Sequence, residues 1–524
     1  MALVKDEMSV NAEEDENESS PLLPQHESQY GKPRRQLYVE PKSIVGDSAG
    51  DFGSQEQAPD HVNVSSEELY TYSPLGFKLK APADSQSSLV TIFVIWNTMM
   101  GTSLLSIPWG TMQSGFTMGI ILIVVVGLIM LYSAYRVLQS PKDIAGSTPE
   151  YEFTDVCEWY FGRPGRGLVL AFSMIAICGA LIVYWVLMSN FLYNTGKYIF
   201  DTVNGVNVTD IVPKYDGSSP VICPTPPHMH NTSLSLKASL KTFSSYWHKQ
   251  KTVPFYLIVL ILPLLNFPSV NFFARFNNIG TLAIFYLIIL VTIKVSQLGF
   301  HMDVHWISCN DLHYVPEFRK TFPTMIGILS QAFFLHNCII TVMKNNRHQK
   351  NNVRDLSIAY GLVGGTYIYV GIFIFSTFPA PPLWKTCIQQ NFLDNFPNND
   401  ILAFVARIFF LFQMITIYPL LAYILRVQLF TEIYGKTYPS LLHVLVLNII
   451  LISSGVAMAR LYPQIGTIIR YVGATCSLVF VFVLPHLTHI LAKWRRGTLR
   501  WYSTIPHCLL MVLGVVNFVA QFFI

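Results

Sequence analysis

Apolar runs of about 20 residues recur along this sequence from Leu89 to the last residue, Ile524. A helix needs about 20 consecutive apolar residues to cross a bilayer. Of all residues, 52% are hydrophobic and only 13% are charged. A soluble protein carries about 25% charged residues, so this chain has too few charges to cover a soluble fold. The bilayer is therefore the solvent that the chain requires.

The runs predict an all-α membrane protein with about eleven transmembrane helices. Polar loops separate the runs, and each boundary is uncertain by several residues. The expected spans are Leu89–Trp109, Gly119–Val137, Leu168–Phe191, Phe255–Phe272, Leu282–Leu298, Pro323–Met343, Leu356–Phe378, Ile401–Arg426, Leu441–Ala459, Gly466–Leu491 and Pro506–Ile524.

The segment before the first span, residues 1–87, has a different composition. It is rich in Glu, Asp, Ser, Pro and Gln, with too little apolar surface to order a packed core. It lacks the basic and apolar regions with which a signal peptide begins. We expect a disordered cytosolic tail, followed by a transmembrane domain over residues 88–524.

Lys and Arg are concentrated in alternate short loops, as the positive-inside rule requires of correctly counted spans. The loop after the sixth expected span, for example, holds Lys344, Arg347 and Lys350. An odd number of spans puts the two termini on opposite sides, so with the tail in the cytosol the C-terminus lies outside or in a lumen. The long connection of residues 194–253 then lies on the non-cytosolic side. Its glycosylation acceptors, Asn207 and Asn231, agree with that orientation.

Two cysteines on the non-cytosolic side are expected to form a disulfide. Cys223 lies in the long loop and Cys387 follows the seventh span, in a compartment that permits disulfides. Cys309 lies on the same side and is the main competitor for the pairing. The alternative is that all three are free thiols.

The first span is polar and flexible where a plain anchor would be apolar. Its middle contains Asn97, Thr98, Gly101, Thr102 and, further on, serines. Exposed backbone at membrane depth is tolerated only where it is buried in protein or lines a cavity, so we expect a broken helix. Such breaks leave half-helix N–H groups that face a carboxylate and carbonyls that bind a cation. The alternative is that the small residues only allow close helix packing.

The sixth span has a matching polar interruption, from Phe333 to Thr341. Interruptions at corresponding places indicate a binding site between two inverted repeats, which would be spans one to five and six to ten. In the eighth span, Gln413, Thr416 and Tyr418 supply neutral oxygens that could complete a sodium site with Asn97. Thr416 is weak evidence, because Thr readily bonds its own backbone.

Several other functions are excluded or disfavoured. No Asp or Glu lies deep inside a span, which favours sodium coupling or no coupling over a carboxylate proton relay. The chain has no nucleophile elbow, Walker loop or zinc helix motif, so we do not expect an enzyme. A net charge of +4 is too small to indicate binding to nucleic acid, and lipid is the expected surrounding partner.

Five stretches resemble the lysosomal neutral amino acid transporter 9 family, and the likeness runs from about Tyr70 onward. That family belongs to the sodium-coupled neutral amino acid transporters of the amino acid/auxin permease group. The resemblance implies a five-plus-five inverted repeat (LeuT-like) with one extra C-terminal helix. The stretches are Trp96–Thr102, Val183–Asn190, His336–Thr341, Asn351–Asp355 and Gln390–Pro397.

The resemblance also implies site residues. Thr98, Met99, Met100 and Thr102 would line an arginine-binding site together with Cys338. The sodium site would include the neighbouring asparagine of the first span. Substrates would be arginine, leucine or other neutral amino acids, moved across the lysosomal membrane.

Two further functions are expected of the tail, docking of partner proteins and sorting. Family members are said to dock the Rag GTPases and Ragulator through it, and segments 58–62 and 72–76 resemble parts of it. The tyrosine-rich stretch expected upstream of Ala58 is absent, as in a divergent paralogue. Glu18, Leu22 and Leu23 form an acidic dileucine pattern that adaptors use to sort cargo to late endosomes and lysosomes.

Two functions remain open at this point. One is a secondary transporter with sodium as the expected coupling ion. The other is a sensor of the same fold, which binds luminal arginine and signals to Rag GTPases and a growth-control kinase complex without substantial flux. Both need the same pocket, so the residues alone do not choose between them.

Overall fold

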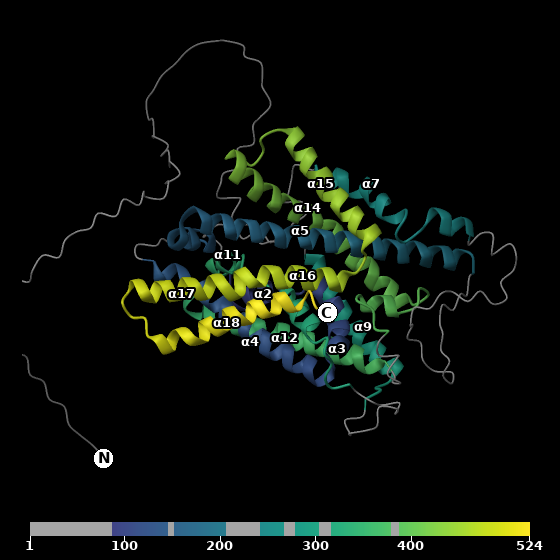
Figure 1. The fold of residues 1–524 in the computed structure, drawn as a ribbon. Coiled ribbons are helices and arrows are strands. Elements are labelled where there is room, and N and C mark those ends of the chain that lie inside the picture. The colour runs from purple at the N-terminus through teal and green to yellow at the C-terminus, as the bar shows by residue number, and fades with distance from the viewer. Residues whose placement is uncertain (1–85, 145–150, 206–240, 267–277, 303–315, 379–386) are drawn as a thin grey trace, which may run out of the picture. The chain divides into compact units, whose positions relative to one another are not determined.

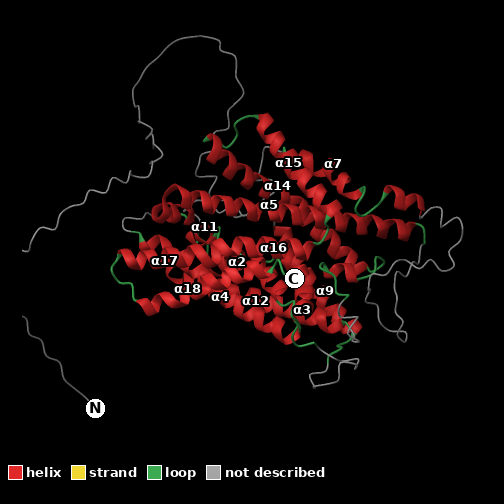
Figure 2. Cartoon of the chain, in the orientation of Figure 1, coloured by secondary structure: helices red, strands yellow, loops and turns green. Residues whose placement is uncertain are grey.

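The computed structural model describes residues 86–144, 151–205, 241–266, 278–302, 316–378 and 387–524 (Figure 1). All of them belong to one compact unit, Val64–Ile524. Helices joined by loops make up this part of the chain, and its β-structure is an isolated parallel bridge between Gln86 and Asn346 (Figure 2). The all-α fold class is therefore confirmed.

The helices follow the predicted spans in order. The first half contains α2 (Ser88–Met99), η1 (Thr102–Ser106), α3 (Ile107–Ser114), α4 (Phe116–Gln139), η2 (Ser140–Asp143), α5 (Phe153–Val203), α7 (Val253–Leu265) and α9 (Asn278–Leu298). The second half contains α10 (Pro323–Ala332), α11 (Ile339–Lys344), η3 (Gln349–Asn351), α12 (Asn352–Thr377), η4 (Phe392–Asn395), α14 (Ile401–Tyr434), α15 (Leu441–Leu461), α16 (Ile465–Ser477), the π-helical η5 (Leu478–Val483), α17 (Leu484–Arg495) and α18 (Trp501–Ala520).

Among the described residues, eight helices are long and apolar enough to cross a membrane, or nine if the bent first span is included. The fourth predicted span falls short of that length because α7 has 13 residues. The sixth falls short because it is split into α10 and α11. The predicted count of about eleven therefore stays a prediction.

Large apolar side chains cover the outside of the helices. Leu128, Leu509 and Val516 are 60%, 63% and 56% exposed, and each lies in a membrane-length helix. So many exposed large apolar side chains are unusual for a soluble monomer, because water does not solvate them favourably. Lipid tails are the environment that matches it.

Close backbone approach joins α10 to α16 at the centre of the bundle. A Cβ placed on Gly473 of α16 would lie 2.4 Å from the carbonyl oxygen of Gly327 in α10. No larger residue can occupy position 473 without moving one helix away from the other. This contact sets the distance between the sixth and tenth spans, and both border the site described next.

Candidate functional site

The first span is broken as the sequence predicts. Helix α2 ends at Met99, and the chain resumes as η1 and α3 at an angle of 52° to it. Gly101 lies between the two parts in an extended conformation, with φ −99° and ψ −161°. A Cβ on Gly101 would meet no atom within 4 Å, so space adjoins the break.

The sixth span is broken at the corresponding place. Helix α10 ends at Ala332 and α11 begins at Ile339, and the six residues between them are not α-helical. Phe333 at the start of this break is 1% exposed and its ring stacks on that of Tyr360 at 5.9 Å. Breaks in both the first and the sixth span are the pair that an inverted repeat predicts.

One tyrosine of α12 joins the two breaks. The Tyr367 hydroxyl lies 2.8 Å from the carbonyl oxygen of Met99 and 2.8 Å from that of Ala332. These carbonyls end α2 and α10, where a helix leaves its last carbonyls without intrahelical partners. Tyr360, two turns earlier on α12, donates to the carbonyl of Phe333 at 3.1 Å. Helix α12 therefore satisfies backbone oxygens that the breaks leave free.

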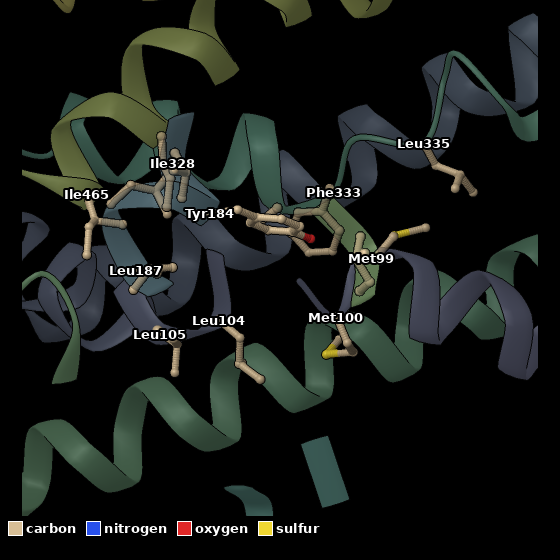
Figure 3. Close-up of a cluster of buried hydrophobic side chains, with 14 of the residues drawn as sticks. Met99, Met100, Leu104, Leu105, Tyr184, Leu187, Ile328, Phe333, Leu335 and Ile465 are labelled. Carbon is tan, nitrogen blue, oxygen red and sulfur yellow. The ribbon is translucent and has the colours of Figure 1, made fainter. Parts of the chain in front are cut away.

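The five residues implied as the substrate site lie at these two breaks. Met99, Met100 and Cys338 are buried, and Figure 3 shows both methionines within a cluster of buried apolar side chains. Thr98 and Thr102 are partly exposed. The Thr98 hydroxyl donates to the carbonyl of Val94 at 2.7 Å, and the Cys338 thiol lies 3.6 Å from that of Leu335. Helix α11, which follows Cys338, contacts α2.

Neutral oxygens gather where α2, α9 and α14 meet. Asn97 accepts a hydrogen bond from the Thr281 hydroxyl at 3.0 Å. The neighbouring Gly280 lies against the amide of Gln413, to which an added Cβ would approach within 2.7 Å. The Gln413 amide oxygen is buried and has no hydrogen-bond partner among the described residues. A buried oxygen without a donor suits a cation, so this oxygen set fits a sodium ion.

Thr416, the other predicted sodium ligand, donates its hydroxyl to the backbone carbonyl of Gln413 at 2.8 Å. Its lone pairs remain able to bind a cation, because only its proton is used. Sequence reasoning missed Thr281, which lies one residue before the predicted start of the fifth span. It also missed Tyr367, because nothing in a helical pattern shows which residue faces a distant break.

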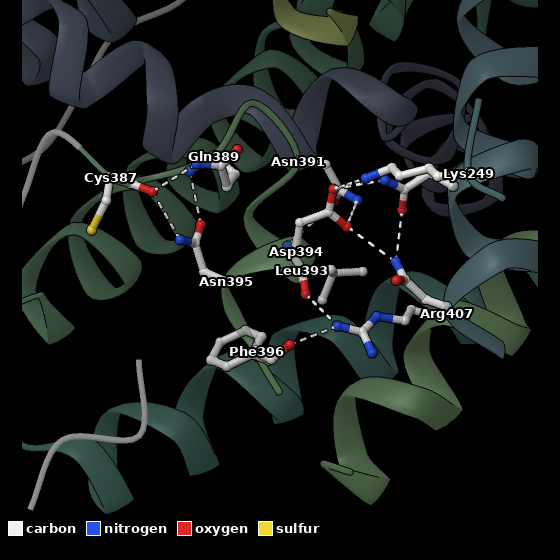
Figure 4. Close-up of polar contacts among 11 residues, drawn as sticks. Lys249, Cys387, Gln389, Asn391, Leu393, Asp394, Asn395, Phe396 and Arg407 are labelled. Atoms are coloured by element: carbon white, nitrogen blue, oxygen red, sulfur yellow. Dashed lines mark hydrogen bonds and ion pairs between the residues drawn. The ribbon is translucent and has the colours of Figure 1, made fainter. Parts of the chain in front are cut away.

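An ordered turn at one end of the bundle lies near α5 and α14 (Figure 4). Asp394 in this turn accepts from Asn190 at 2.6 Å and from Asn391 at 3.0 Å. Arg407, which is 1% exposed, donates to the carbonyls of Leu393 and Phe396 at 2.7 and 2.8 Å. These contacts hold residues 387–396 in one conformation over the bundle end.

Cys387, at the start of this turn, is disulfide-bonded. Both candidates for its partner, Cys223 and Cys309, lie outside the described residues. The same holds for the glycosylation acceptors Asn207 and Asn231 and for the sorting residues Glu18, Leu22 and Leu23. The Cys223–Cys387 pairing and these modification and sorting assignments therefore stay predictions.

Comparison with known proteins gives a family match over most of the chain. A model described as "Transmembrane amino acid transporter protein" matches residues 84–217 and 227–524. A Danio rerio protein named neutral amino acid transporter 9 is 53% identical over 527 residues, covering 94% of this chain and 95% of that protein. Its Rattus norvegicus namesake is 49% identical and covers 98% of both chains.

A more distant relative comes from Caenorhabditis elegans. It is named sodium-coupled neutral amino acid transporter 9 homolog and is 39% identical, covering 90% of this chain and 78% of that protein. Among solved structures, MhsT in complex with L-phenylalanine aligns with a TM-score of 0.48 at 13% identity. That alignment covers 84% of this chain and 99% of the other.

Proposed function

Because this chain belongs to the transmembrane amino acid transporter family, we propose that it is a sodium-coupled transporter of α-amino acids in the lysosomal membrane. The resemblance to the transporter 9 family is confirmed, as is the expectation that the chain is not an enzyme. One observation carries the proposal furthest. The breaks of spans one and six meet at Tyr367, whose hydroxyl contacts the last carbonyl of α2 and that of α10.

The substrate binds at these breaks in our proposal. The backbone N–H groups at the start of η1 are at a helix N-terminus, where a substrate carboxylate is stabilised. Thr98, Met99, Met100, Thr102 and Cys338 surround the substrate side chain. Because no acidic residue lies deep in a span, arginine would rely on carbonyl dipoles for its guanidinium, whereas leucine would need none.

Sodium binds beside the substrate, at Asn97 and Thr416, to which the structure leads us to add Thr281 and Gln413. All four residues offer neutral oxygens, the ligand type that a small hard cation takes. Bound sodium would supply a positive charge that bridges α2, α9 and α14. Sodium binding would thereby link α2, the part of the first span before the break, to helices α9 and α14.

Asn97→Ala should weaken sodium dependence before it changes substrate selectivity. Removing one buried polar partner typically costs about 1–3 kcal/mol, or roughly five- to 150-fold in apparent sodium affinity. Leucine uptake into vesicles holding the purified protein, measured across a sodium titration, checks this. Thr281→Val should act in the same direction.

Thr292→Val provides the control for that titration. Thr292 lies on the same helix as Thr281, but it is exposed and bonds the carbonyl of Ile288 at 2.8 Å. Its replacement should leave the sodium titration unchanged. Identical sodium curves for wild type, Asn97→Ala and Thr281→Val would show that sodium is not bound here.

A second candidate function is an amino acid sensor that signals through the tail to Rag GTPases and Ragulator without substantial flux. The tail segments 58–62 and 72–76 favour it. The same vesicles discriminate the two functions, because a sensor would bind leucine or arginine without accumulating label. We favour transport, since the chain belongs to a family of amino acid transporters.

We propose a lysosomal location with a cytosolic N-terminus and a luminal C-terminus. Protein captured with intact lysosomes should carry glycans on Asn207 and Asn231, which lie in the long loop. A glycosidase should increase its gel mobility, and Asn207→Gln with Asn231→Gln should abolish that shift. A shift that survives the double asparagine substitution would contradict glycosylation at these two asparagines.

The acidic dileucine pattern predicts sorting of the protein to lysosomes. Leu22→Ala with Leu23→Ala should therefore reduce the amount of protein that is captured with intact lysosomes.

A further inference from the structure

A polar cavity lies at the bundle end that carries residues 387–396, and no residue of the two breaks lines it. It measures about 250 Å³. Its wall combines polar and charged side chains of α5, residues 249–250 and the turn with apolar residues near the start of α16. The residues that line it and carry the argument are Asn190, Lys249, Gln390, Asp394, Pro463 and Ile465.

Opposite charges lie side by side in this cavity. The Lys249 ammonium is 3.5 Å from a carboxylate oxygen of Asp394, a longer contact than the 2.6 Å bond from Asn190 to the same oxygen. The Lys249 side chain is 42% exposed and the Asp394 carboxylate 19%. Lys249 is therefore the more weakly held partner of this ion pair, and its ammonium has N–H groups available for a second anion.

Part of the cavity lining is apolar. Val186, Ala459, Pro463 and Ile465 line it, and none of them carries a polar side-chain group. A lining that combines a cation, a carboxylate and aliphatic side chains matches a molecule with both charges and a short apolar side chain. An α-amino acid zwitterion has that arrangement.

We propose that this cavity is an outer binding subsite for zwitterionic α-amino acids, separate from the site at the breaks. Lys249 pairs with the ligand carboxylate and Asp394 accepts from the ligand ammonium, while the ligand side chain lies against the aliphatic residues of the lining. The proposal rests on the proposed function, because it assigns the same substrate class to a second place in the chain.

Gln390 separates this subsite from the broken first span. Its side-chain oxygen accepts from the backbone N–H of Gly466 at 2.9 Å, and its amide lies 3.3 Å from the Thr467 hydroxyl. Its backbone carbonyl accepts from Ser106 in η1 at 2.6 Å. Gln390 thus links the turn, the first span and the tenth span beneath the cavity.

The test measures equilibrium binding of radiolabelled leucine to the purified full chain. Thr102→Trp fills the site at the breaks, so binding that survives in this variant belongs to the outer subsite. We expect it to survive at lower affinity. Adding Lys249→Met should weaken it by about three- to tenfold, because the lysine is partly screened by water. Lys249→Arg should retain it.

Lys251→Met in the same background is the matched control, because Lys251 is exposed and does not line the cavity. It should leave leucine binding unchanged. An amine that lacks the carboxylate, 3-methylbutylamine, should not compete for the outer subsite. Equal effects of the two lysine substitutions would overturn the proposal.

Failure of the subsite and failure of the proposed function give different results. If wild type binds leucine and Thr102→Trp binds none, there is no outer subsite, and the site at the breaks stands. If Thr102→Trp binds as many leucines as wild type and Lys249→Met in wild type abolishes binding, the cavity is the only site. The latter result would support the subsite and contradict the site at the breaks.

Discussion

Thr102→Trp should abolish leucine uptake while the protein still folds and inserts. Thr102 begins η1 directly after the break, and the neighbouring Gly101 faces space with no atom within 4 Å of an added Cβ. An indole ring at position 102 should enter that space and exclude the substrate sterically. Insertion depends on the apolar spans, which the substitution leaves intact. Uptake by reconstituted vesicles, beside size-exclusion chromatography of the purified protein, measures both effects.

Thr102→Ser is the matched control for this substitution, because it keeps the hydroxyl and adds no volume. It should retain most of the uptake. Normal uptake by the tryptophan variant would mean that the first-span break serves helix packing and not binding. The proposed mechanism would then be wrong.

Gly473→Val should prevent the chain from reaching its folded state. A Cβ at this position would lie 2.4 Å from the Gly327 carbonyl oxygen and 2.8 Å from the Gln331 backbone nitrogen. Backbone atoms cannot turn aside as a flexible side chain can, so α10 and α16 would have to separate. Overpacking of a core typically costs about 1–3 kcal/mol, and we expect a cost at or above the top of that range. The yield of monodisperse protein in detergent and its thermal midpoint measure this.

Gly365→Ala is the comparison for the stability measurement. Gly365 is also in a transmembrane helix, α12, but a Cβ there meets no atom within 4 Å. Alanine has a higher helix propensity than glycine, so this variant should be as stable as wild type or slightly more so. A Gly473→Val protein with the yield and midpoint of Gly365→Ala would contradict the close approach of the two helices.

The positions of the spans could be predicted from the sequence because a bilayer imposes a length and a polarity on each one. The apolar runs from Leu89 onward correspond in order to the observed helices. The break in the first span was also predictable, since Asn97, Thr98 and Gly101 are poorly suited to an uninterrupted apolar helix. The match between that break and the one after Phe333 followed from comparing the two halves.

The partners of these residues depended on the tertiary structure. Asn97 meets Thr281 from a helix 184 positions away, and Tyr367 reaches Met99 from 268 positions away. A residue's helical position does not say which helix lies opposite it, because that depends on how all the spans pack. Apolarity and polarity along the chain determined where helices form and break, whereas side-chain contacts between distant helices decided which oxygens lie together at the site.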